Sequence, residues 1–242
     1  MKKYVSRISF LLIVSCSFAA GPVNLEDSGI VATGLEIEYG YTGSTVGNDT
    51  TRESGFTLTS AAWPGGHIGI SKSFFHTPYH VAGTGDTELS VKQALAENTA
   101  LALSGTMRDG DDKNGFGSSF HEYTATVAQD FSFGKTTLFS NLAYTTYDKR
   151  ILVSDGDDDD DETQNNWGIG LGLGYDLTEH WGVCAEVTKQ IVHDNYLQDV
   201  DGQVIGTLGI EYNLENYSFD LSYTSIPEEK DYVFSLGTTV SL

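Results

Sequence analysis

The sequence has 242 residues and a formal net charge of −21, with 34 Asp and Glu residues against 13 Lys and Arg residues. An acidic excess of this size would be repelled by phosphate backbones, which argues against a nucleic-acid-binding protein. Of the two cysteines, only Cys184 lies beyond the predicted signal peptide, which excludes an intramolecular disulfide in the mature chain. The 27 Gly, 13 Tyr and 12 Phe residues, with only 4 Pro, suit an all-β protein with long strands.

Residues 1–19 have the layout of a secretory signal peptide. Three basic residues precede an apolar run, and Ser17 and Ala19 supply the small side chains expected before the cut. The apolar run is too short to cross a membrane as a helix. A second interpretation, which the sequence leaves open, is a lipoprotein signal with Cys16 lipidated. Residues 20–33 show no period and are expected to form a periplasmic N-terminal lead-in.

From residue 34 to residue 242 the pattern is that of a β-barrel. Apolar residues fall on alternate positions in short segments separated by turn signals, which predicts strands. In the segment from Trp167 to Leu177, aliphatic residues alternate with glycines and aromatic residues flank them, as lipid interfaces favour. Twelve strands are predicted, at residues 34–42, 55–62, 67–75, 85–95, 99–108, 119–133, 136–147, 167–177, 180–192, 203–214, 217–225 and 231–242. An even number of strands of this length predicts an antiparallel transmembrane β-barrel of about 12 strands.

The predicted connections alternate in length. Those after even-numbered strands are short, whereas those after odd-numbered strands are longer and more polar, such as residues 43–54 and the longest, 148–165. Outer-membrane barrels have short periplasmic turns and long extracellular loops. We therefore expect both termini on the periplasmic side and the long loops on the cell surface.

The last segment, residues 231–242, alternates throughout and also matches the insertion signal of bacterial outer-membrane barrels. The polar, glycine and hydrophobic positions of that signal are occupied by Ser235, Gly237, Val240 and Leu242, although the usual last residue is Phe. A terminal strand with an unshielded apolar face suits a barrel wall in lipid better than the edge of a soluble sheet. We expect the barrel-assembly machinery to recognise this segment.

Strand parity predicts which charged side chains face the barrel interior. A charge facing lipid costs about 2–4 kcal/mol at the bilayer midplane, so these residues are expected to face inward. The predicted pore lining consists of Glu36, Glu38, Glu88, Lys92, Glu122, Glu186, Glu211 and Asp220. A net negative pore is expected to prefer cations to anions. The alternative is that these side chains form hydrogen-bonded networks that fill a narrow barrel.

The loop at 148–165 carries the longest acidic run of the chain. Carboxylate oxygens suit Ca²⁺ and Mg²⁺, so weak divalent binding is one interpretation, through Asp157, Asp158, Asp159, Asp160, Asp161 and Glu162. A solvated acidic loop is the alternative. The sequence contains no zinc-protease, nucleophile-elbow or P-loop motif, and we expect neither catalytic activity nor a cofactor.

Residues 82–149 resemble a known family of outer-membrane proteins. The matching positions are Gly83, Gly85 and Asp86 before one strand, residues 100–103 in the next, and Asn141 and Tyr144 in a later one. The segment is similar to the outer-membrane transporters grouped under the MetA pathway of phenol degradation. The resemblance implies a channel, linked in some members to uptake of aromatic compounds, but the acidic run is not part of the family's pattern.

These patterns together predict a bacterial outer-membrane channel for passive transport of small solutes, with small aromatic or hydrophobic compounds among the candidates. Its partners would be outer-membrane lipid, the barrel-assembly machinery, the solutes and divalent cations at the acidic loop, with no nucleic acid. The alternative function is a non-conducting structural or surface-interaction barrel that acts through acidic extracellular loops.

Overall fold

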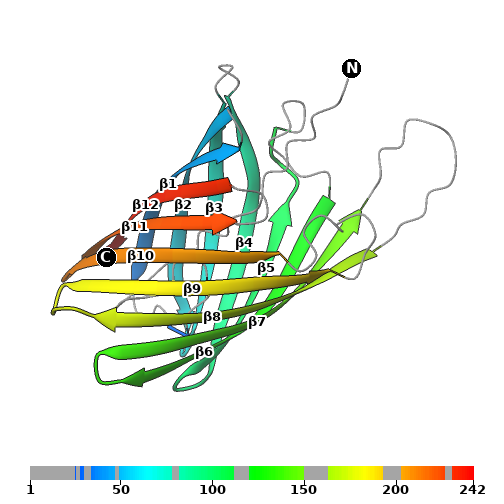
Figure 1. The fold of residues 1–242 in the computed structure, drawn as a ribbon. Helices are drawn as coiled ribbons and strands as arrows, with labels where there is room; N and C mark the ends of the chain where they lie inside the picture. The colour runs from blue at the N-terminus through cyan, green and yellow to red at the C-terminus, as the bar shows by residue number, and fades with distance from the viewer. Residues whose placement is uncertain are drawn as a thin grey trace, which may run out of the picture.

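Twelve β-strands make up most of the described chain (Figure 1). The computed structural model describes residues 25, 28–29, 34–46, 49–77, 82–111, 120–149, 163–192, 203–226 and 231–242. The strands are β1 (Leu35–Val46), β2 (Asp49–Trp63), β3 (Gly66–His76), β4 (Ala82–Ala96), β5 (Thr99–Met107), β6 (Phe120–Phe133), β7 (Thr136–Lys149), β8 (Thr163–Asp176), β9 (Trp181–Val192), β10 (Val204–Leu214), β11 (Tyr217–Ile226) and β12 (Asp231–Ser241). Within the described ranges, no helix is long and apolar enough to cross a membrane.

The sheet closes into a barrel because β1 pairs with β12. All neighbouring strands are antiparallel, and their order round the barrel follows the sequence. At the end of this seam, the Leu35 amide donates to the Leu242 carbonyl over 3.2 Å and the Leu242 amide donates back over 2.8 Å. Closure gives each strand two partners, which a wall in lipid requires for its backbone groups. The prediction of an all-β, twelve-stranded barrel is confirmed.

The tight turns gather at the end of the barrel where β12 ends, which we call the short-turn end (Figure 1). They connect β2 to β3, β4 to β5, β6 to β7, β8 to β9 and β10 to β11. Gly65 and Gly134 have φ angles of 74° and 64° in two of these turns. Glycine adopts this left-handed conformation without the strain that a Cβ would add. The prediction of short connections after the even-numbered strands is confirmed.

The hairpin between β1 and β2 differs from the prediction. The prediction of a polar loop at 43–54 is wrong, because β1 continues to Val46 and β2 begins at Asp49. These two residues pair with each other. Apolar alternation marks only the part of a strand that needs an apolar face. The Ser and Thr residues beyond it continue the strands, because backbone pairing needs no apolar side chains and β-branched Thr favours extended structure.

A bulge interrupts the pairing of β3 with β4. The register shifts between Lys72 and Phe74, so Gly85 and Asp86 of β4 lie opposite one residue of β3. Lys72 breaks the apolar alternation of its strand, which by itself indicates either a bulge or a position at the membrane interface, and the structure has the bulge directly after Lys72. A Cβ on Gly85 would lie 2.7 Å from Cε2 of the buried Phe75 side chain, so only glycine fits this close approach without a shift.

Candidate functional site

The two faces of the barrel wall differ in chemistry, and β1 shows how. Its successive side chains Glu36, Ile37, Glu38 and Tyr39 have exposed fractions of 7%, 38%, 5% and 52%. Strand residues alternate between faces, so the exposed apolar side chains lie outside and the buried glutamates lie inside. The same alternation runs through the other strands, whose exposed large side chains are almost all aliphatic or aromatic.

All eight residues of the predicted pore lining occupy inward positions. The side chains of five are buried, namely Glu36, Glu38, Lys92, Glu186 and Glu211. The other three are half-buried, namely Glu88, Glu122 and Asp220. The structure thus brings them to one lumen, while their role in conduction remains a prediction.

The carboxylates are concentrated on one sector of the inner wall. Five of the seven come from strands β9, β10, β11 and β1, which lie together across β12: Glu186, Glu211, Asp220, Glu36 and Glu38. Glu211 and Asp220 face each other directly in the β10–β11 register. Like charges in directly opposed positions repel each other, so this sector concentrates carboxylates on one side of the inner wall.

Hydroxyl groups support the carboxylates at the β1–β12 seam. Thr239 Oγ1 donates to Glu38 Oε1 over 3.4 Å, and Ser241 Oγ donates to Glu36 Oε1 over 3.3 Å. Both are long hydrogen bonds, but hydrogen bonds to charged acceptors are stronger than neutral ones. They connect the two glutamates of β1 to side chains of β12.

The predicted insertion-signal residues lie on both faces of β12. Ser235 accepts a hydrogen bond from Thr42 Oγ1 over 3.2 Å on the inner side of the seam. Gly237 lies under the Asp220 carboxylate, where a Cβ would collide with it. Val240 pairs with Ile37, and Leu242 is 71% exposed. The two inward residues, Ser235 and Gly237, therefore have roles in packing, independent of recognition by the barrel-assembly machinery.

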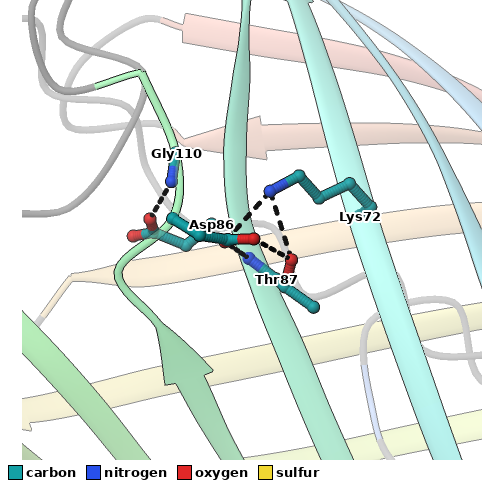
Figure 2. A network of polar contacts seen from close by, with 5 residues as sticks. Lys72, Asp86, Thr87 and Gly110 are labelled. Atoms are coloured by element: carbon teal, nitrogen blue, oxygen red, sulfur yellow. Dashed lines mark hydrogen bonds and ion pairs between the residues drawn. The ribbon is translucent and has the colours of Figure 1, made fainter.

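A polar network braces the end of the barrel opposite the short turns, between β3, β4 and the residues after β5 (Figure 2). Lys72 Nζ lies 3.0 Å from Asp109 Oδ1 and donates to Thr87 Oγ1 over 3.1 Å. Thr87 donates to Asp109 through its amide and its hydroxyl, both over 2.7 Å. The Gly110 amide donates to Asp86 Oδ1 over 2.8 Å. The residues that follow β5 are therefore held against β4.

The pKa of Asp109, which lies beyond the end of β5, reflects this network. Desolvation acts to raise it, but the hydrogen bonds from Thr87 and Lys72, with the Lys72 charge, outweigh that effect and lower the pKa to about 2. Asp109 is therefore ionised over the whole ordinary pH range, and the brace persists with it.

The lining prediction omitted Asp130, Ser28 and Leu25, which the structure places inside the barrel. Asp130 of β6 accepts two hydrogen bonds from Ser28, and Leu25 is 3% exposed against glycines of β8. The parity of β6 already predicts that Asp130 faces inward. The stretch containing Leu25 has no period, so no pattern in the sequence could have placed it.

The acidic run predicted to bind divalent cations, residues 157–162, lies outside the described residues. In the part of the chain that the structure describes, no group of three or more His, Cys, Asp and Glu side chains is arranged to hold a metal ion. The predicted signal peptide also lies outside the described part.

Comparison with known proteins identifies the fold. No family model and no curated protein matches the sequence. The chain is similar to the COG4313 outer membrane channel from Pseudomonas putida F1, with a TM-score of 0.66 and 13% identity over 91% of this chain and 100% of that one. For the NanC porin, the TM-score is 0.62 at 12% identity, over 86% of this chain and 100% of that one.

A third similar structure is the β domain of the Bordetella autotransporter Brka, with a TM-score of 0.54 and 13% identity over 87% of this chain and 100% of that one. Identities this low show the shared fold and no more. Because the fold serves a channel, a porin and an autotransporter domain, the function of this chain must be argued from its own lumen.

Proposed function

We propose that this chain is a bacterial outer-membrane channel for passive transport of small solutes. The observation that carries the proposal is a carboxylate-rich inner face in a closed barrel with an apolar outer face. The apolar face suits contact with outer-membrane lipid. In eight-stranded barrels the side chains can fill the interior. A twelve-stranded barrel is wider, which leaves room for a polar path through the lumen.

The lumen also supports a preference among solutes. The seven carboxylates of the predicted lining, with Asp130 in addition, outnumber Lys92 and make small cations the favoured ions. The finer proposal, that small aromatic compounds are among the solutes, rests on the resemblance of residues 82–149 to the transporters of the phenol-degradation family. The C-terminal segment would recruit the barrel-assembly machinery during export.

Planar-bilayer recording of the purified, folded protein tests the channel. Addition of the protein should produce discrete conductance steps in KCl, whereas the same detergent buffer without protein should produce none. Folding is verified separately by the shift in electrophoretic mobility on boiling. A folded protein that gives no steps would contradict passive transport.

A further inference from the structure

Two residues that precede β1, Leu25 and Ser28, contact the inner wall of the barrel. Leu25 is 3% exposed and contacts Gly170 and Gly172 on the inner face of β8. A Cβ added to Gly170 would collide with the Leu25 side chain, and one added to Gly172 would lie 3.1 Å from Leu25 Cδ1. Leu25 therefore fills space that side chains of β8 would otherwise occupy.

A second anchor holds Ser28 to β6. The amide and the hydroxyl of Ser28 both donate to Asp130 Oδ2, over 2.7 Å and 2.8 Å. Two hydrogen bonds to one carboxylate oxygen are charge-assisted and fix the direction of the donors. Between the two anchors lies β7, whose Phe139 is 5% exposed and would lie 3.3 Å from a Cβ on Gly172.

The position of these contacts along the barrel matters for passage of solutes. Gly170 lies near the middle of β8, whereas Asp130 lies close to the short-turn end of β6, so the two anchors extend from mid-height toward the short-turn end. In the circular strand order, β1 with its buried glutamates is diametrically opposite β7. A twelve-stranded barrel has limited free cross-section, and residues seated inside it take part of that area.

We propose that Leu25 and Ser28, held against β8 and β6, form the constriction of the lumen and set the largest solute that passes. The proposal rests on the proposed channel function. Leu25 and Phe139 are 3% and 5% exposed, so they fill the lumen beside β7 and β8 and leave the passage on the side of β1 and its carboxylates. Small solutes, cations above all, pass it, and bulky ones are excluded.

The first experiment compares the wild type with the double variant Leu25→Ala/Ser28→Ala. Neither substitution touches a strand pairing, so the barrel should fold, as the mobility shift on boiling can verify. The variant should show a conductance higher by about two-fold or more, because a wider constriction passes more ions. Liposome swelling should show that it also admits larger uncharged oligosaccharides than the wild type.

The second experiment tests placement without using conduction. Leu25→Cys with Gly170→Cys, in a Cys184→Ser background, should form a disulfide on oxidation of the assembled barrel, seen as a cross-linked peptide by mass spectrometry. The matched control places the second cysteine at Gly168 of the same strand, where an added Cβ meets only Ala143 within 4 Å. The control pair should not cross-link.

The outcomes separate the two proposals. A conducting wild type with a double variant of equal conductance and equal sugar cut-off would overturn the constriction and leave the channel standing. A silent wild type with a conducting variant would support the constriction and overturn passive transport. Silence of both would overturn both, and a 25–170 pair that fails to cross-link would overturn the placement of Leu25.

Discussion

Gly237 of β12 and Asp220 of β11 share one position on the inner wall. A Cβ on residue 237 would collide with the carboxylate of Asp220, so Gly237→Ala forces that side chain to move. We expect a loss of about 1–3 kcal/mol in unfolding free energy, as for other overpacked sites. The measurement is the denaturant midpoint of the protein refolded in lipid.

Gly206→Ala in β10 is the matched control, because a Cβ there has nothing within 4 Å. Adding Asp220→Ala to Gly237→Ala should recover part of the loss, since it removes the group that collides. Equal midpoints for the Gly237 and Gly206 variants would contradict the role of Gly237 in packing.

Ion selectivity is a second property set by single residues. The triple substitution Glu36→Gln, Glu38→Gln and Glu88→Gln removes three inward charges, so the preference for K⁺ over Cl⁻ should fall. The reversal potential in a KCl gradient should move toward zero, and the wild-type preference should itself fade at high salt, because screening shortens the reach of the charges.

The control for this measurement carries the same change in net charge. Glu97, Glu179 and Glu215 are exposed in short turns, so their replacement by Gln removes three charges outside the lumen. This control should keep the wild-type reversal potential. An anion-selective wild type, or an equal shift in both triple variants, would refute the assignment of selectivity to the lumen glutamates.

At the scale of elements, the brace after β5 depends on ionised Asp109. Its pKa in the folded state, about 2, lies below its ordinary value of 3.8. A lowered pKa stabilises the brace fully above the ordinary value, and this stabilisation disappears as the pH falls through about 2. The Thr87 amide donates to Asp109, so its protection from hydrogen exchange should stay constant down to about pH 4. Below about pH 4 this protection should fall.

Asp109→Asn should speed the hydrogen exchange of the Thr87 amide at neutral pH. The Gly110 amide donates to Asp86, so its exchange reports on the other half of the brace. The companion variant Asp86→Asn should reverse the pattern and affect Gly110 first. An Asp109→Asn barrel with unchanged exchange at Thr87 would mean that backbone pairing alone holds these residues.

The elements also show which parts of a barrel a sequence predicts. Strands such as β11 were predicted to within one residue, because apolar and polar residues alternate along it. The hairpin of β1 and β2 was not, because its polar ends pair through backbone groups that leave no apolar period. Periodicity thus reports contact with lipid, and only indirectly the length of a strand.

For the molecule as a whole, parity placed every predicted lining residue inward because bulges are few and shift the register locally. The segment at Leu25 escaped prediction for a different reason. Its place in the lumen depends on the absence of side chains at Gly170 and on Asp130, residues remote in sequence whose proximity arises only when the barrel closes. A contact of this kind has no local signature.

Assembly of the whole barrel should depend on its last three residues. Deleting 240–242 removes the pairing of Val240 with Ile37 and Tyr217 and the closing hydrogen bonds between Leu242 and Leu35. Without them the seam opens at the short-turn end and leaves backbone groups unsatisfied in lipid, so heat-modifiable protein should be absent from the outer membrane.

Leu242→Phe, which restores the usual last residue of the signal, should assemble at least as well as the wild type, whereas Leu242→Asp should not. Comparison with refolding of the purified variants in lipid, where no machinery acts, separates loss of recognition from loss of the seam. Normal amounts of folded, truncated protein in cells would contradict both requirements.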